Sequence, residues 1–530
     1  MSAKSPISRR WFLRGSIAAG AGALLAACAP AAAPPGVTPK PAEPTKPAAE
    51  PTKPAEPTKP AAEPTKPAAA AAPTNTPAAA AAATKPAEPT KPAAAAAPTN
   101  TPAAAAAATP TATPVPVREA AAGRKYIIEI QHPHSGPALE PRNKQFAKFE
   151  EMNPDIGVKG VWAANDLSTN QKLFTAVAAG TPPNVTWVDG PQVAEWAARG
   201  VIADLSDRFK NDKLTQEDFW TPSWKQNIWR GKIHAMTHSS DANFGFFWNK
   251  TVFQDAGLDP EKPPKTIDDM DELHQKITKV EGNNVVRMGT IPWTVYGSAN
   301  SFFTWGWAWG AEFFDETNEK LTTNNELSVK ALDWMVEKYA KKHDISRISG
   351  FAAGFGTGEN HPFFVGKTAM APFGPWELGN IKRFAPNLKY GITFLPQGPP
   401  PALPHSSWVG GWCMGIPNGG KLQDQAWTFL RWFGASPDGA QILGETASNF
   451  SGYKKNPWLE TAAKDKDLAQ FIEILKEARH QRPVQPAQGF LMGEIARAVD
   501  DAIFGRKPVK EALDQATQNT QKELDKILKK

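Results

Sequence analysis

The hydrophobic pattern divides the chain into two parts of different character. Apart from one short apolar run near the start, large apolar side chains are almost absent up to residue 123, whereas from Tyr126 onward they recur with the spacing of strands and helices. Residues 126–130 and 158–163 predict strands. Between them, a helical pattern places Phe146 and Phe149 on one face.

Helical and strand-like patterns continue to alternate after this point. Residues 168–180 predict a helix with Ser168 or Thr169 as its N-cap, residues 184–190 a strand, and residues 191–200 a helix with a proline at its start. This alternation is typical of parallel strands with helices on both faces of the sheet. In such sheets, ligands gather at the carboxyl ends of the strands.

A second structural unit is predicted to begin around residues 239–250. The strand expected over 244–249 is too apolar to be half exposed. A helix begins with a capping-box pattern at Thr266 and Asp269, and residues 326–342 form an amphipathic helix with Leu332, Met335, Val336 and Tyr339 on one face. After a further helix over 421–433, the chain ends in mostly helical sequence from about Lys464. The pattern as a whole predicts two α/β lobes.

The segment before the folded part has a different composition. Residues 28–123 consist mainly of Pro, Ala, Thr, Lys and Glu. Proline removes backbone donors, and the lack of large apolar side chains leaves nothing to offset the conformational entropy of folding. We expect a disordered tether here. A low-complexity expansion without function is the alternative.

The first 27 residues have the pattern of an export signal. Arg9 and Arg10 precede an apolar run over 17–27 of about 11 residues, well short of the roughly 20 that cross a bilayer as a helix. The segment resembles a twin-arginine signal peptide, and the residues up to Cys28 resemble a bacterial lipobox. We expect cleavage before Cys28, which would carry the lipid anchor. The alternative, a buried N-terminal helix, finds no packing surface downstream.

Charge and cysteine content exclude several functions. Of the 59 basic and 53 acidic residues, 12 and 6 lie in the first 123 positions, which leaves 47 of each beyond them. A neutral folded part gives no electrostatic basis for binding nucleic acid or an anionic membrane surface. Since the only cysteines are Cys28 and Cys413, no internal disulfide is expected, and packing alone must stabilise the core.

Six motif groups occur in an informative order. They are AAGTPPNVTWVDG with GVIADLSD, FFWNKTVFQDAGL with KTIDDMDEL, FFTWGWAWGAEFF, FFVGKTAMAPFGPW, AWTFLRWF and FGRKPVKEALDQA. Spread over some 400 residues behind a lipoprotein signal, they resemble the family 1 extracellular solute-binding proteins of ABC importers, and are similar to the maltose-binding protein group. No single motif is specific, but their order is.

This resemblance implies two α/β lobes of the periplasmic-binding-protein type, joined by a hinge that the chain crosses about three times. We place the crossings near residues 241–245, 409–413 and 449–454. Lobe 1 would comprise 124–241 with 412–450, and lobe 2 would comprise 242–411 with 451–530.

The aromatic residues agree with carbohydrate binding. Several of the 19 Trp lie among Gly and Pro in WGWAWG, FGPWE and SSWVGGW, where we expect loops. A sugar ring offers a C–H face to a flat aromatic surface and hydroxyl groups to carboxylate, amide or backbone partners. Carried over by motif, the resemblance implies a ligand site at Asp189, Asp241, Asn243, Phe302, Phe303, Trp305, Trp376, Trp408, Gly410, Gly411, His134 and Ser135. Trp376 would be the main stacking ring, and Phe302, Phe303 or Trp305 a second aromatic subsite.

Several of these residues have a purely structural alternative. Trp307, Trp427 and Trp432 fall in helical or apolar surroundings and are expected in the core. Asp189 could serve only as the N-cap of the helix that follows it. Met492 stands where the maltose group has another stacking aromatic, which argues against a long maltodextrin as the ligand.

A catalytic or metal-dependent function finds little support. The pairs His132 with His134 and His234 with His238 lack further metal ligands or the glutamate of a zinc-protease helix. The glycines over 354–358 lack the Lys-Ser/Thr of a phosphate loop, and Cys413 has the surroundings of a packed side chain. Paired carboxylates of a secreted glycosidase remain open, because Asp and Glu are plentiful.

The expected function is that of a lipid-anchored receptor without a cofactor or metal. It would close two lobes on a carbohydrate and deliver it to an ABC permease. We expect a monomer that is held to the membrane through Cys28. The main alternative is a secreted lipoprotein enzyme acting on polysaccharide, and a further one is a surface adhesion module.

Overall fold

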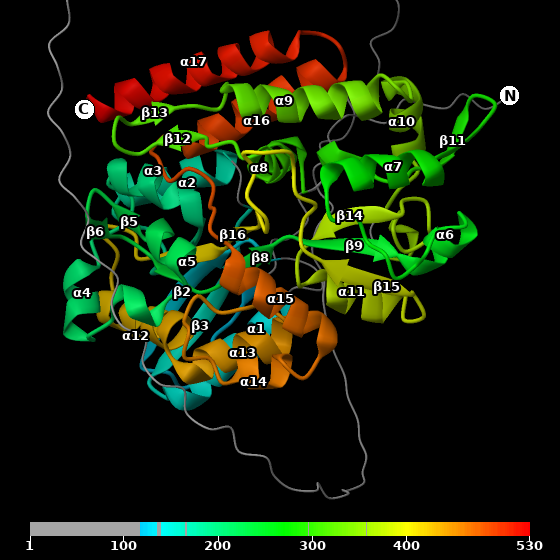
Figure 1. Cartoon of the computed structure of the whole chain (residues 1–530). Coiled ribbons are helices and arrows are strands. Elements are labelled where there is room, and N and C mark those ends of the chain that lie inside the picture. The colour runs from blue at the N-terminus through cyan, green and yellow to red at the C-terminus, as the bar shows by residue number, and fades with distance from the viewer. Residues whose placement is uncertain (1–116, 135–138, 165–166, 295, 357, 530) are drawn as a thin grey trace, which may run out of the picture. The chain divides into compact units, whose positions relative to one another are not determined.

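A six-stranded mixed sheet frames the first lobe (Figure 1). The computed structural model describes residues 117–134, 139–164, 167–294, 296–356 and 358–529. The strand order is β1-β3-β2-β4-β17-β7, with bounds β1 Val117–Arg118, β2 Tyr126–His132, β3 Ile156–Trp162, β4 Val185–Asp189, β7 Met236–Thr237 and β17 Trp412–Gly415. Only β3, β2 and β4 are parallel; β1, β17 and β7 pair antiparallel, so the sheet is less uniformly parallel than predicted. The reason is that β17 and β7 reach the sheet from the hinge and not through a helical crossover.

Helices cover both faces of this sheet. They are α1 Leu139–Met152, α2 Leu167–Ala178, α3 Val193–Ala198, α12 Gln423–Ala435 and α13 Pro437–Ala447. On one face, Phe146 and Phe149 of α1 pack with Trp187 of β4 and Phe429 of α12, as their helical spacing predicted. The next residue of β4, Val188, packs on the other face against α2 and α3. Since α2 begins at Leu167, Ser168 and Thr169 lie within its first turn and not at its N-cap.

The second lobe is built on the three-stranded antiparallel sheet β14-β9-β15. The strands are β9 Gly245–Asn249, β14 Met370–Phe373 and β15 Tyr390–Thr393. Every residue of β9 is buried, as predicted, because the sheet is covered on both faces: Phe246 and Trp248 enter one core cluster and Phe247 another. The surrounding helices are α6 Lys250–Asp255, α7 Ile267–Ile277, α8 Ser298–Ala308, α9 Glu326–Met335, α11 Glu377–Phe384, α15 Lys466–Glu477, α16 Gln488–Ile503 and α17 Val509–Leu528.

Shorter elements complete the described chain. They are α4 Ser206–Asn211, α5 Thr221–Gln226, β5 Ile228–Trp229, β6 Lys232–Ile233, β10 Lys279–Glu281, β11 Asn284–Arg287, β12 Phe314–Asp315, β13 Lys320–Leu321, α10 Ile345–Ala352 and α14 Trp458–Ala462. The predicted capping box is confirmed. The Thr266 hydroxyl accepts a hydrogen bond from Asp269 N (3.0 Å), and the Asp269 carboxylate accepts one from Thr266 N (2.9 Å).

Three chain segments pass side by side between the two sheets. β8 Asp241–Asn243 pairs antiparallel with β16 Trp408–Gly410, and Figure 1 shows both strands between the sheets. Beside them, Ser240 N donates to Phe450 O (2.8 Å), and Gly452 N donates to His238 O (3.3 Å). These segments coincide with the three expected hinge crossings, and the two-lobed α/β fold is confirmed.

The folded part begins earlier than residue 124. Val117 and Arg118 form β1 and pair with Val161 and Gly160 of β3. The Arg118 guanidinium forms an ion pair of 2.6 Å with the buried Glu150. The expected end of the tether at residue 123 was therefore too late, because one buried ion pair fixes a segment whose composition otherwise resembles the tether. The signal at 1–27, Cys28 and the tether up to residue 116 lie outside the described residues.

Candidate functional site

One face of the β8/β16 ribbon carries the predicted hinge residues. Because side chains alternate along a strand, Asp241 and Asn243 point to the same side, and their antiparallel partners Gly410 and Trp408 share it. Ala242 and Val409, on the other side, are fully buried in the second lobe's core. Gly410 leaves room for Asn243, since a Cβ atom there would lie 2.1 Å from the amide nitrogen.

Two oxygens on this face are buried and have no hydrogen-bond partner. Asp241 is 7% exposed and Asn243 is 5% exposed, and the atoms concerned are Asp241 Oδ1 and Asn243 Oδ1. Burial is the main cause that raises the pKa of Asp241 to about 7, and the charge of Asp189 raises it further, whereas Ser239 and Arg482 act in the opposite direction. Unpaired buried oxygens are uncommon and indicate a site where hydrogen-bond donors are missing.

Asp189 connects the first lobe to this face through an arginine that the sequence did not single out. It stands at the end of β4, at the N-cap position of the short helical turn Gly190–Gln192, but its side chain makes no cap hydrogen bond. Instead, Asp189 Oδ1 accepts a hydrogen bond of 2.6 Å from Arg482 Nη2, and both side chains are largely buried. The alternative that Asp189 only caps a helix is therefore wrong.

A second contact between the lobes lies close by. Glu195 of α3 accepts a hydrogen bond of 3.0 Å from Gly489 N, in the first turn of α16. Burial raises the pKa of Glu195 above its usual value. A carboxylate at a helix N-terminus is favourable because the helix dipole and free N–H groups point toward it. Two carboxylates of the first lobe thus bond to residues of the second lobe.

Trp376 belongs to a group of aromatic rings on the second lobe. Its indole Nε1 donates to the Tyr296 hydroxyl (2.9 Å), and the two rings are nearly perpendicular with centroids 5.3 Å apart. Tyr296 in turn stacks on Phe244 at 5.1 Å, which follows β8 directly. Trp376 remains only partly buried. The predicted stacking residue therefore sits at the rim of an aromatic group that is continuous with the hinge.

Glu377 adds a second carboxyl group, which sequence reasoning missed. It is the first residue of α11, it is buried, and its Oε2 accepts a hydrogen bond of 3.2 Å from Asn380. Burial raises the pKa of Glu377 to about 7. Burial and the charges of Glu377 and Asp241 raise the pKa of Tyr296 well above its usual value, so both carboxyl groups lie within electrostatic reach of Tyr296. The only sequence signal for Glu377 was its position directly after the GPW motif.

The second aromatic subsite expected at Phe302, Phe303 or Trp305 is not supported by the structure. The segment is helical, not a loop: it forms α8, and all three side chains are fully buried in the second lobe's core. Position 306 has no room for a side chain, because a Cβ atom there would lie 2.4 Å from the Phe313 ring. Close packing explains the glycine that suggested a loop.

Trp408 is also more deeply placed than expected. It is 2% exposed, and its Nε1 donates to Thr304 in α8 (3.1 Å). The Arg482 guanidinium lies 5.4 Å from the centre of its ring. The ring of Trp408 thus packs against the guanidinium of Arg482.

Gly411 has a backbone conformation that favours glycine, because its φ is +147° and a Cβ atom would lie 2.2 Å from Ser239 O. Trp307, Trp427, Trp432 and Cys413 are in the core, as predicted.

His134 lies in the first lobe beside a buried arginine. Its Nε2 is 3.0 Å from Arg142 Nη2, and Arg142 lies over the Trp187 ring at 4.7 Å. Ser135, which was predicted with it, lies outside the described residues. No group of three or more His, Cys, Asp or Glu suited to a metal occurs among the described residues.

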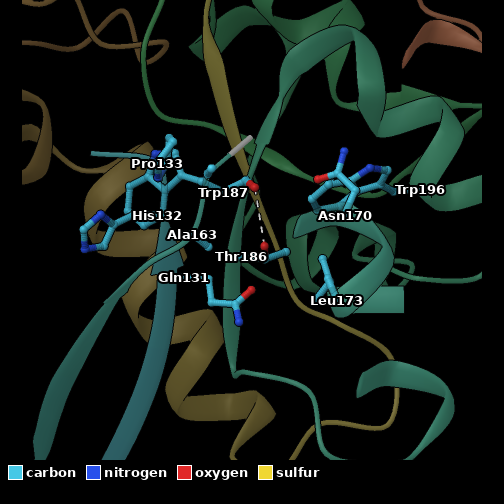
Figure 2. A pocket seen from close by; sticks show the side chains of 10 residues that line it. Gln131, His132, Pro133, Ala163, Asn170, Leu173, Thr186, Trp187 and Trp196 are labelled. Carbon is cyan, nitrogen blue, oxygen red and sulfur yellow. Dashed lines mark hydrogen bonds between the residues drawn. The ribbon is translucent and has the colours of Figure 1, made fainter. Parts of the chain in front are cut away.

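Two hollows in the described structure hold none of the predicted ligand residues. Figure 2 shows the smaller, about 20 Å³, beside the ends of β2 and β3, with His132, Asn170, Thr186 and Trp196 around it. Its volume suits about one water molecule. The larger, about 740 Å³, lies between α2, α3, β5 and the end of α17. The hinge residues Asp241 and Asn243 are instead buried.

No helix in the part of the chain that the structure describes combines the length and the hydropathy that a bilayer-spanning segment needs.

Comparison with known proteins agrees with the fold. Residues 136–440 match the family model described as bacterial extracellular solute-binding protein, and residues 6–26 match the twin-arginine translocation pathway signal sequence. The chain is 24% identical over 425 residues to the sn-glycerol-3-phosphate-binding periplasmic protein UgpB of Escherichia coli, covering 74% of this chain and 91% of that protein. A binding protein of Brucella abortus is 24% identical over 404 residues, covering 75% of this chain and 91% of the relative.

Solved structures with this fold include sugar complexes. The structure of CpMnBP1 with mannobiose bound aligns with a TM-score of 0.66 at 23% identity, covering 75% of this chain and all of that one. Maltose-bound MalE3 of T. maritima aligns with a TM-score of 0.60 at 22% identity, again covering 75% of this chain and all of the other. Both alignments support the two-lobed architecture.

Proposed function

Because the chain belongs to the family of bacterial extracellular solute-binding proteins, we propose that it binds a mono- or short oligosaccharide between its lobes and delivers it to the membrane subunits of an ABC importer. The observation that carries this proposal is the pair of buried, unpartnered oxygens Asp241 Oδ1 and Asn243 Oδ1. They lie on the hinge near the Tyr296–Trp376 aromatic pair. A saccharide supplies hydroxyl donors for the oxygens and a C–H face for the ring.

The relatives support this choice of ligand. Structures with the same fold hold mannobiose and maltose, which are uncharged saccharides. The family consists of solute-binding proteins, so the chain is a binding protein and not an enzyme. A polysaccharide-degrading activity, the main alternative, has no specific observation in its favour.

Binding would be coupled to the relative position of the lobes. Asp241 and Asn243 are too deeply enclosed for a ligand to enter while Asp189 is bonded to Arg482. Ligand entry therefore requires the lobes to separate, and the ligand must bind the closed state more tightly than the open one to favour closure. We propose lobe 1 over 117–241 with 412–450 and lobe 2 over 242–411 with 451–530.

The site of action follows from the N-terminal signal. The match to a twin-arginine signal indicates export across the cytoplasmic membrane. We propose in addition that Cys28 carries the lipid anchor and that the segment after it tethers a monomer to the membrane. Replacing Cys28 with Ser should release the protein from the membrane fraction, and mass spectrometry of the wild-type N-terminal peptide should show a diacylglyceryl group. Retention of the variant in the membrane would contradict the anchor.

Calorimetric titration with glucose, mannose, mannobiose and maltose tests the ligand class. We expect stoichiometric binding of at least one probe without any product on prolonged incubation. Trp376→Ala should weaken that binding by about tenfold or more, because an aromatic contact contributes on the order of 1 kcal/mol beyond its buried area. Trp432→Phe, in the first lobe's core, is the control and should leave the affinity unchanged. Turnover, or binding of no sugar probe, would refute the proposal.

A further inference from the structure

The hinge site has an excess of hydrogen-bond acceptors and carries one basic side chain that is already paired. We propose that the site selects its ligand by charge, accepting uncharged saccharides and rejecting phosphate esters, with Asp241 and Glu377 as the residues that set this preference. The inference rests on the proposed function and goes further, because it names the chemical class within which the ligand falls.

Arg482 is the basic residue at the site. Its Nη2 donates to Asp189 Oδ1 at 2.6 Å, and the side chain is 8% exposed. Its Nε has no partner, so Arg482 keeps one N–H group for a ligand oxygen. Its charge, however, is balanced by Asp189. Among the residues that the structure describes, neither Asp241 nor Glu377 forms an ion pair with a basic side chain.

The remaining polar groups are acceptors. Asp241 Oδ1 and Asn243 Oδ1 are buried and unpartnered. Glu377 is buried, and its described hydrogen bond is the one that it accepts from Asn380. A sugar hydroxyl can donate to each of these oxygens and can accept from Arg482 Nε. The hydrogen-bonding capacity of an uncharged polyol therefore complements the site.

A phosphate ester has the opposite character. At neutral pH its oxygens are acceptors with one to two negative charges. Against Asp241, Glu377 and Asn243 they find repulsion or unpaired acceptors. Arg482 Nε can donate to one phosphate oxygen, but the positive charge of Arg482 is already balanced by Asp189. A buried site amplifies such like-charge contacts, because the local dielectric is low. Phosphate recognition uses clustered arginines or lysines, or helix N-termini with free N–H groups. The described site has one basic side chain, the paired Arg482, and the N-termini of α11 and α16 already carry the carboxyl groups of Glu377 and Glu195.

The distinction matters because the relatives bind ligands of both kinds. The Escherichia coli relative is named for sn-glycerol-3-phosphate, whereas the structural relatives hold mannobiose and maltose. Overall identity to the two groups is nearly the same, so it does not discriminate between them. The charges of the side chains at the hinge do discriminate between the two kinds of ligand.

The test compares uncharged sugars with phosphate esters, and for glucose and mannose it compares each sugar with its own ester. Glucose, mannose, mannobiose and maltose are titrated calorimetrically into the mature protein at pH 7.5 and low salt, beside glucose 6-phosphate, mannose 6-phosphate and sn-glycerol 3-phosphate. We expect at least one uncharged probe to bind and every phosphate ester to bind at least about 100-fold more weakly, since like-charge contacts cost several powers of ten in affinity.

Variants assign the preference to the two carboxyl groups. Asp241→Asn and Glu377→Gln each remove a negative charge with little change of shape. Each should reduce the affinity gap, which is the ratio of the dissociation constants of phosphate ester and sugar, by about tenfold or more. Glu473→Gln, at an exposed position on α15, should leave the gap unchanged. Circular dichroism confirms folding, and either carboxyl variant is informative if the other fails to fold.

The outcomes separate the inference from the proposed function. If sugars and phosphate esters bind equally, sugar binding stands and the charge preference is refuted. If only phosphate esters bind, both are refuted, and if no probe binds, the sugar receptor is refuted together with the inference built on it. A gap that persists unchanged in both carboxyl variants would refute the assignment to Asp241 and Glu377.

Discussion

Arg482 donates a hydrogen bond to Asp189 across 2.6 Å, although the two residues lie 293 positions apart in the chain. Asp189 ends a strand of the first lobe's sheet, and Arg482 belongs to the segment between α15 and α16. Their ion pair is therefore a direct connection between the lobes at the hinge. Its second role is electrostatic, because Arg482 also lowers the pKa of the neighbouring Asp241.

Replacing Arg482 with Ala should destabilise the protein markedly. The change leaves Asp189 and Asp241 without a cation, and breaking a buried ion pair from one side typically costs about 3–5 kcal/mol. Because Asp189 is 16% exposed, we expect the lower end, about 3 kcal/mol, by urea unfolding at pH 7.5. Lys144→Ala removes an exposed pair with Glu140 and should have no measurable effect. Equal stability of the two variants would contradict the assigned role of Arg482.

Ligand affinity should depend on pH through Asp241. Burial raises its pKa to about 7 in the ligand-free structure, and a sugar hydroxyl that donates to the carboxylate favours the ionised form. Protons and ligand then compete, so the affinity should decrease as the pH falls from about 8 to 6. Calorimetry on the wild type and on Asp241→Asn checks this, because the variant should bind more weakly and lose that part of the pH dependence. An identical pH profile for both proteins would rule out Asp241 as the titrating group.

Acid should destabilise the first lobe through its buried histidines. Burial and the charge of Arg142 lower the pKa of His132 to about 3, and they also hold the pKa values of His134 and His238 well below the usual value. A neutral buried histidine contributes stability that is present above its unfolded pKa of about 6.5 and is lost as the pH falls toward the folded value.

The variant His132→Phe isolates one of these groups. Below about pH 6, the stability of the wild type relative to this variant should fall by up to about 1.4 kcal/mol per pH unit. Urea unfolding at pH 7.5, 6, 5 and 4 measures the difference. Comparison with the variant is essential, because Asp241 and Glu377, whose pKa values are raised to about 7, change stability in the opposite direction over the same range. A constant difference between pH 7.5 and 4 would contradict the prediction.

Gly306 should be intolerant of a methyl group. A Cβ atom at this position in α8 would lie 2.4 Å from the Phe313 ring, so Gly306→Ala should destabilise the protein by about 1–3 kcal/mol. Gly350 in α10 has open space around its Cβ direction, and Gly350→Ala should instead be neutral or stabilise by up to about 1 kcal/mol. Thermal unfolding of the pair distinguishes close packing from a general preference for alanine in helices.

Local patterns predicted the elements that local patterns determine. The spacing of Phe146 and Phe149 identified the buried face of α1, and the Thr266–Asp269 pair identified the start of α7. Both signals act within one or two helical turns, so the sequence carries them completely. The same holds for the continuous apolar run of β9.

The errors have a tertiary origin. The glycine among the tryptophans of α8 suggested a loop, but it is required by the approach of Phe313, which no local pattern reveals. Arg482, Tyr296 and Glu377 were missed for the same reason, since each acquires its role only when distant segments meet at the hinge. Motif resemblance singled out Asp189, Asp241 and Trp376 as candidates, whereas their contacts with Arg482 and Tyr296 came from the structure.

The two ends of the described fold belong to different lobes. Val117 lies in β1, an edge strand of the first lobe's sheet, and α17 packs on α16 and α9 in the second lobe. A donor dye placed near Val117 and an acceptor near Lys529 would therefore report the separation of the halves by energy transfer, without a label near the hinge. The native topology thus makes this chain a ready scaffold for an optical sensor of whatever solute it captures.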